Sequence, residues 1–168
     1  MNVSIRPLRE NDALVSWKWR QDPDIFGPTV GGWYKNASLE KEMEWIRNVL
    51  TREDEMRFAI LAEGLYVGNV YLTSISPDSA EMGIFIGNKA YWHKGVGWNA
   101  RLLAVKYAFE ILKVKKVVSR IKSSNTKALS IAMGQGSVPL RREGNLVYLE
   151  LSAEDFYSEN NNSADKRF

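Results

Sequence analysis

A short glycine-bearing turn is the part of this 168-residue sequence that bears most directly on chemistry. Lys94-Gly95-Val96-Gly97-Trp98 lies between a stretch typical of a strand and a run with helical apolar spacing. A strand, a glycine turn and a helix in this order present unpaired backbone N–H groups and a positive helix end to an anion. The turn therefore predicts phosphate binding, and the alternative is an ordinary tight connection.

Of two common phosphate motifs, one is disfavoured for this turn and the other is excluded. A dinucleotide-binding fingerprint is disfavoured, because Ala100 stands at the position of the third glycine and no parallel-strand run precedes the turn. A P-loop requires a Gly-Lys-Ser/Thr triplet, which the sequence lacks.

The charges of the chain are unevenly divided along its length. Ten lysines and arginines lie between Lys89 and Lys127, with Glu110 as the one acid in that segment. The remaining residues carry 13 basic and 19 acidic side chains. The basic segment is expected either to face a polyanion or to form a solvated helix face. The acidic remainder argues against a nucleic-acid partner.

Composition excludes several classes of site. The sequence has no cysteine and one histidine, His93, so disulfides, thiolate metal sites, cysteine nucleophiles and multi-histidine metal centres are excluded. We expect no metal. No secretory signal and no apolar segment long enough to span a membrane is visible, so the cytoplasm is the expected location.

Apolar patterning predicts a single α+β domain, with a mostly antiparallel mixed sheet and about four helices. Strands are expected at 4–8, 56–62, 65–75, 80–86, 116–121 and 140–151, the last bent near residues 144–145. Helices are expected through Leu14 and Arg20 as far as Pro23, and at 38–51, 96–112 and 125–133, with a loop at 25–36. Residues 1–157 would form the domain, and 158–168 a frayed tail.

Four stretches, in this order and at these spacings, carry a family resemblance: Ile5-Arg6-Pro7-Leu8 with Asp12 and Trp19-Arg20-Gln21-Asp22-Pro23-Asp24; Ala80-Glu81-Met82-Gly83-Ile84-Phe85-Ile86; Tyr91-Trp92-His93-Lys94-Gly95-Val96-Gly97; and Asn125-Thr126-Lys127-Ala128-Leu129. Together they resemble the GCN5-related N-acetyltransferase (GNAT) superfamily. The resemblance is closest to the branch that acts on ribosomal proteins and nucleotide-linked amino sugars.

The resemblance implies acetyl-CoA as co-substrate. The turn amides would hold its pyrophosphate, with His93 as a ligand contact, and the pantetheine arm would lie between two strands. The implied cofactor-binding residues are Gly83, Ile84, Phe85, Ile86, His93, Lys94, Gly95, Val96, Gly97, Trp98, Asn125 and Lys127.

The implied reaction is direct attack of a primary amine on the thioester, without an acyl-enzyme. Glu81 is the candidate base, Asn125 is placed near the thioester, and Ser130, Ser137 or solvent would serve as the acid. The sequence departs from the family pattern here, because Ala132 replaces the usual tyrosine and Gly136-Ser137 replaces the usual Gly-Phe. A catalytically weakened domain that senses acetyl-CoA or serves as a scaffold is therefore the alternative.

The acceptor is expected to be a small-molecule or peptide amine: a nucleotide-linked amino sugar or a protein N-terminus. Trp33 and Tyr34 offer stacking surfaces or plug the core, and one of Arg141 and Arg142 can point toward an acceptor phosphate. The resemblance is also compatible with a homodimer.

Overall fold

The computed structural model describes residues 1–30 and 35–164 and contains one seven-stranded mixed sheet. Its order is β1-β2-β3-β4-β5-β7-β6, and every neighbouring pair is antiparallel except β4 and β5. The strands are β1 (Val3–Pro7), β2 (Met56–Ala62), β3 (Leu65–Thr73), β4 (Ser79–Ile86), β5 (Lys116–Lys122), β6 (Val138–Glu143) and β7 (Leu146–Ser152). The predicted α+β class is confirmed.

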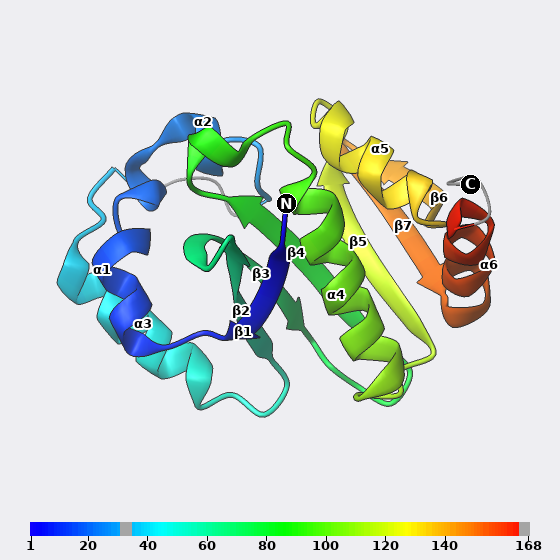
Figure 1. The fold of residues 1–168 in the computed structure, drawn as a ribbon, viewed down its shortest axis with the longest axis horizontal. Helices are drawn as coiled ribbons and strands as arrows, with labels where there is room; N and C mark the ends of the chain where they lie inside the picture. Colours follow the sequence, from blue (N-terminus) through cyan, green and yellow to red (C-terminus); the bar gives the residue numbers. More distant parts are fainter. Residues whose placement is uncertain (31–34, 165–168) are drawn as a thin grey trace.

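Six α-helices accompany the sheet in the described residues: α1 (Ala13–Ser16), α2 (Pro23–Phe26), α3 (Leu39–Leu50), α4 (Val96–Glu110), α5 (Thr126–Gly134) and α6 (Ala153–Ala164). Strand alternation sends Phe58 and Ile60 of β2 into the main core with α4, whereas Ala59 packs with α1 and α3. The two sets of helices thus cover opposite faces of the sheet. In Figure 1, α4 runs along the sheet and α1–α3 lie together on the left.

Local turn chemistry accounts for the predicted β2–β3 hairpin. Glu63 and Gly64 adopt φ values of 50° and 80°, as a two-residue hairpin turn of mirror-image type requires.

The prediction of one bent strand at 140–151 is wrong. The chain reverses at Gly144, whose φ is 57°, and forms the separate strands β6 and β7.

The helical predictions are wrong at both ends of the chain. The expected first helix is broken into short segments, and Pro23 begins α2 because its missing N–H suits the first helical position while Asp22 caps the turn. The expected loop at 25–36 therefore begins two residues later. Near the other end, residues 158–164 were expected in a frayed tail and instead continue α6, which Phe156 anchors in the core.

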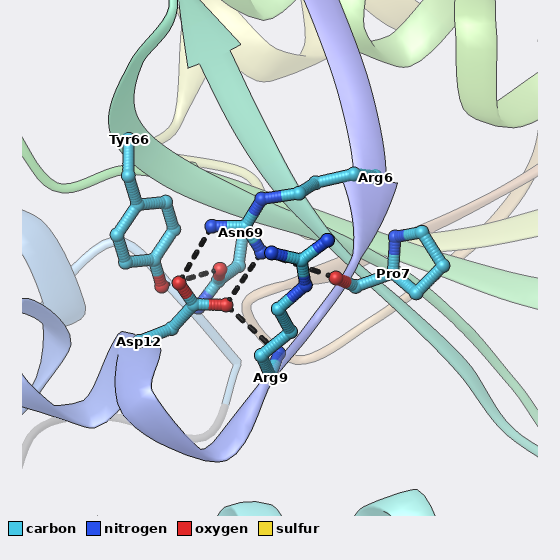
Figure 2. Close-up of polar contacts among 6 residues, drawn as sticks. All are labelled: Arg6, Pro7, Arg9, Asp12, Tyr66 and Asn69. Atoms are coloured by element: carbon cyan, nitrogen blue, oxygen red, sulfur yellow. Dashed lines mark hydrogen bonds and ion pairs between the residues drawn. The ribbon is translucent and has the colours of Figure 1, made fainter.

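The residues that opened the family resemblance build a structural network, shown in Figure 2. Asp12, 8% exposed, accepts two hydrogen bonds from the Arg6 guanidinium (2.7 and 2.8 Å) and one from the Arg9 backbone N–H (2.8 Å). Beside it the Tyr66 hydroxyl donates to Asn69 Oδ1 at 2.7 Å, and burial raises the pKa of Tyr66. The Asp12 bonds fasten β1 to the first helical turn, and the Arg6 guanidinium lies 5.9 Å from the centre of the Tyr66 ring of β3.

We expect Asp12→Ala to lower the free energy of unfolding by about 3 kcal/mol, because it leaves a half-buried guanidinium without its carboxylate. Urea denaturation measures the change. The control is Glu143→Ala, which removes an exposed partner of Arg141 and should change stability by less than about 0.5 kcal/mol. An equal loss of unfolding free energy in the two variants would mean that Asp12 stabilises the fold no more than an exposed ion-pair partner does.

Candidate active site

The predicted turn forms the N-terminus of α4. Gly95 is the N-cap residue and has a φ of 77°, a left-handed conformation that favours glycine. The first intrahelical bond runs from Asn99 N–H to Gly95 O at 3.1 Å, so the amides of residues 96–98 have no acceptor within the helix. These N–H groups and the positive helix end form the anion-binding geometry that the sequence predicted.

Gly97 shows that the turn has room for a ligand. Its backbone is helical, and a Cβ added there would meet only Ile131 Cδ1, at 3.9 Å. Neither backbone strain nor packing within the protein therefore demands a glycine at this position. A missing side chain beside unpaired amides fits a bound phosphate group, since only a close ligand would contact the added Cβ.

The sheet opens next to this turn. The parallel strands β4 and β5 pair only from Ser79 with Lys116 to Glu81 with Val118, and they are unpaired beyond that point. The carboxyl-terminal halves of the two strands therefore leave a gap, and Glu81 lies at its vertex. An extended chain such as pantetheine can hydrogen-bond to the freed strand edge.

A cavity of about 560 Å³ lies at this opening. Eleven predicted residues line it: Ile84, Phe85, Ile86, His93, Gly95, Val96, Gly97, Trp98, Asn125, Lys127 and Ser130. Three predicted residues do not: Gly83, which lies against the Tyr71 ring, the exposed Lys94, and Glu81. The wall also contains residues that sequence reasoning missed: Asp24, Ile25, Pro28, Thr29, Tyr91, Trp92, Ala128 and Ile131.

Glu81 lies on the sheet face opposite α4. Its Oε1 accepts a hydrogen bond from Arg120 Nε at 2.6 Å, and its side chain is 28% exposed. This bond is the largest cause of the raised pKa of Arg120. A solvent-accessible carboxylate at the vertex of the strand gap can accept a proton from an amine that approaches from this face.

The α5 residues have different roles in the structure. Asn125 lines the cavity and caps α5, because its Oδ1 accepts from Ala128 N–H at 3.2 Å. Ser130 is exposed at the cavity wall, whereas Ser137 is 6% exposed and accepts a hydrogen bond from Arg101. Ala132 is fully buried and offers no acid. Ser130 and solvent remain the candidates for protonating the thiolate.

The basic segment does not form one polyanion-binding face. Lys89 pairs with Asp22 and Asp24, and Arg120 pairs with Glu81. One of the ten lysines and arginines of the basic segment, Lys127, lines the cavity. The charge asymmetry is therefore only partly a feature of the cofactor site.

Of the four residues predicted to contact the acceptor, two lie in the described part of the chain. Trp33 and Tyr34 lie outside the described residues. Arg141 lies over the Tyr148 ring at 4.1 Å and pairs with Glu143, and Arg142 donates to Gly144 O. Both arginines are thus engaged in local contacts on β6.

Comparison with known proteins gives the family. A family model described as an acetyltransferase (GNAT) domain matches residues 2–138. The chain belongs to the GNAT family. The predicted resemblance is confirmed, and the protein is an N-acetyltransferase that uses acetyl-CoA as its acetyl donor.

The acetyltransferase PseH of Campylobacter jejuni is 29% identical over 126 residues, which are 74% of this chain and 75% of PseH. The crystal structure of PseH with acetyl coenzyme A matches with a TM-score of 0.71 and 21% identity, covering 90% of this chain and 99% of PseH.

Two further solved structures share the fold. Spermidine N-acetyltransferase from Vibrio cholerae, in complex with CoA and spermine, has a TM-score of 0.82 and 20% identity over 92% of this chain and 98% of its own. FdhC, a nucleotide-linked sugar GNAT, has the same TM-score and identity over 96% of this chain and 93% of its own.

The described residues contain no group of three or more histidines, cysteines or acids arranged to hold a metal ion. Among them, no helix is long and apolar enough to cross a membrane.

Proposed function

We propose that the protein transfers the acetyl group of acetyl-CoA to the primary amine of an acceptor that also carries an anionic group, with a nucleotide-linked amino sugar as the acceptor class. The observation that carries this proposal is a cationic pocket on the sheet face that bears Glu81. The cofactor would lie along the cavity between α4 and α5, with its pyrophosphate at the amides of residues 96–98.

The reaction that we assign to the site beside Glu81, where the β4–β5 pairing ends, is direct acyl transfer. The amine nitrogen attacks the thioester carbonyl carbon, a C–N bond forms and the C–S bond breaks. Glu81, directly or through a water molecule, accepts the proton released by the nitrogen. The departing thiolate takes a proton from solvent, either directly or through the Ser130 hydroxyl, which passes its proton on and receives one from solvent.

The cationic pocket has a volume of about 400 Å³ and lies at the start of α3. Among the described residues, its lining contains three cations and one acid: Arg20, Lys35, Asn36, Ala37, Ser38, Lys41, Glu42 and Trp45. Glu42 is 2% exposed and is bound by both Arg20 and Ser16. The positive excess favours an anionic ligand and disfavours a polyamine.

A line of stacked side chains connects this pocket to Glu81. The Trp45 ring has Arg20 at 4.1 Å and Arg57 at 4.8 Å, and Arg57 lies 4.8 Å from the Tyr71 ring. Tyr71 is the register partner of Gly83, two residues from Glu81. An acceptor with its anion in the pocket and its amine at the vertex would lie along this line.

Two relatives illustrate the alternatives. The nucleotide-linked sugar GNAT FdhC supports the proposed acceptor class, and the spermidine N-acetyltransferase represents a cationic one. Lys41 presents like charge to a cationic acceptor, whereas the charge of Arg20 is compensated by Glu42, and the charge of Lys41 is the physical ground for preferring the anionic acceptor.

Turnover measured as release of free CoA thiol tests the proposal. We expect nucleotide-linked amino sugars to give a kcat/KM at least 100-fold above those of spermidine and of peptides with free N-termini. Preference for spermidine or a peptide would reject the anionic acceptor.

We expect Lys41→Glu to raise the KM for the nucleotide-linked acceptor about 10-fold, because it reverses one charge of the pocket. The KM for acetyl-CoA should not change. Lys115→Glu makes the same charge change at an exposed site outside the pocket, and its acceptor KM should stay within twofold of the wild type. Equal effects of the two substitutions would mean that only net charge matters.

A further inference from the structure

The first two turns of α4 pack directly on α5. A Cβ on Gly97 would lie 3.9 Å from Ile131, and one on Gly134 would lie 3.0 Å from the Trp98 ring. One turn further along α4, Arg101 reaches the residues that follow α5. Gly97 and Trp98 of α4 and Ile131 of α5 all line the cofactor cavity, so this packing joins two parts of the cavity wall.

Arg101 is a buried cation with neutral partners. It is 3% exposed, and its Nη1 and Nη2 donate to Gln135 Oε1 at 2.5 Å and to Ser137 Oγ at 3.0 Å. Gln135 is fully buried and donates in turn to Trp98 O at 2.9 Å. Burial lowers the pKa of Arg101 to about 10.

This network accounts for part of the departure from the family pattern. Ser137 stands where the pattern has phenylalanine, and its hydroxyl is a partner of Arg101. The glycine-rich end of α5 is therefore a fully hydrogen-bonded junction. Apolar residues of similar volume would join two helices at lower desolvation cost, but hydrogen bonds fix distance and direction.

We propose that Arg101 is a positioning residue for acetyl-CoA. Through Gln135 and the Trp98 carbonyl it fixes the end of α5 against the first turns of α4. It thereby sets the separation between the amides of residues 96–98 and the cavity residues of α5. The inference rests on the proposed acetyl-CoA site.

The test compares Arg101→Met with the double variant Arg101→Met/Gln135→Leu, and uses Lys106→Met as a control on the exposed face of α4. Calorimetric titration with acetyl-CoA, steady-state kinetics and thermal unfolding are measured on each, with binding measured well below each Tm. We expect Arg101→Met to bind acetyl-CoA about 10-fold more weakly, with the acceptor KM within twofold. The double variant should regain the wild-type Tm but not the wild-type affinity for acetyl-CoA. Its apolar side chains restore packing between α4 and the end of α5, but they form no hydrogen bonds that fix the position of one relative to the other.

Three results would overturn the positioning role: unchanged affinity in folded Arg101→Met, affinity that returns together with Tm in the double variant, or an equal loss in Lys106→Met. If Arg101→Met does not fold, the double variant and Arg101→Lys provide the same comparison. Lysine keeps the charge without the two-pronged geometry, so its affinity should also fall. Failure of the wild-type protein to bind acetyl-CoA would instead reject the proposed site itself.

Discussion

Replacement of Glu81 by glutamine is expected to lower kcat by about 10²- to 10³-fold, because the amide cannot accept the proton of the attacking amine. Glutamine is nearly isosteric and can still accept the hydrogen bond from Arg120, so the strand geometry should persist. The KM for acetyl-CoA should stay within about twofold, since Glu81 does not line the cofactor cavity. Steady-state kinetics at saturating acceptor measure the effect.

Two further measurements separate base catalysis from a structural effect. The deficit should shrink as the pH rises toward the range in which the acceptor amine is already deprotonated, because the base is then not needed. Glu150→Gln is the matched control, since it removes another carboxylate that is paired with a cation, Lys116, on the neighbouring strands. A kcat for Glu81→Gln within threefold of the wild type would assign proton transfer to another group.

Residues whose structure depends on their immediate neighbours were predictable from the sequence. The Glu63-Gly64 turn needs two positive φ angles, and the glycine turn at the start of α4 needs one, so local composition determines both. Eleven predicted site residues line the cavity, and these were implied by the family resemblance of three short stretches of sequence.

Contacts between distant parts of the chain were not predictable in this way. Contacts from distant parts of the chain hold the α2 wall of the cavity, around Ile25 and Pro28, at the site: Phe26 packs on Phe85 of β4, and Lys122 of β5 donates to Gly27 O. The partner of Glu81 was missed as well, since Arg120 lies 39 residues away and adjoins it only through the parallel β4–β5 pairing. Periodicity gives no signal for either contact.

Gly97→Glu is expected to weaken acetyl-CoA binding by more than 100-fold. The new side chain would project where the turn amides meet the ligand, and its carboxylate would repel the pyrophosphate. The fold should not suffer, because a Cβ at this position meets nothing closer than 3.9 Å. A carboxylate in the first turn of α4 should also interact favourably with the helix dipole. Stability and affinity are thus expected to move independently or in opposite directions.

Calorimetric titration with acetyl-CoA and desulfo-CoA, together with thermal unfolding, measures both quantities. Gly97→Ala should cause a smaller loss of affinity, about 10-fold, because it adds bulk without charge. Asn99→Glu places the same charge two residues further along the helix, on an exposed side chain outside the cavity, and should cost no more than about threefold. If Asn99→Glu weakened binding as much as Gly97→Glu, the effect would be one of general charge and Gly97 would have no specific role. If Gly97→Glu bound normally, the pyrophosphate would have to lie elsewhere, and the absence of a side chain at Gly97 would have no explanation in ligand binding.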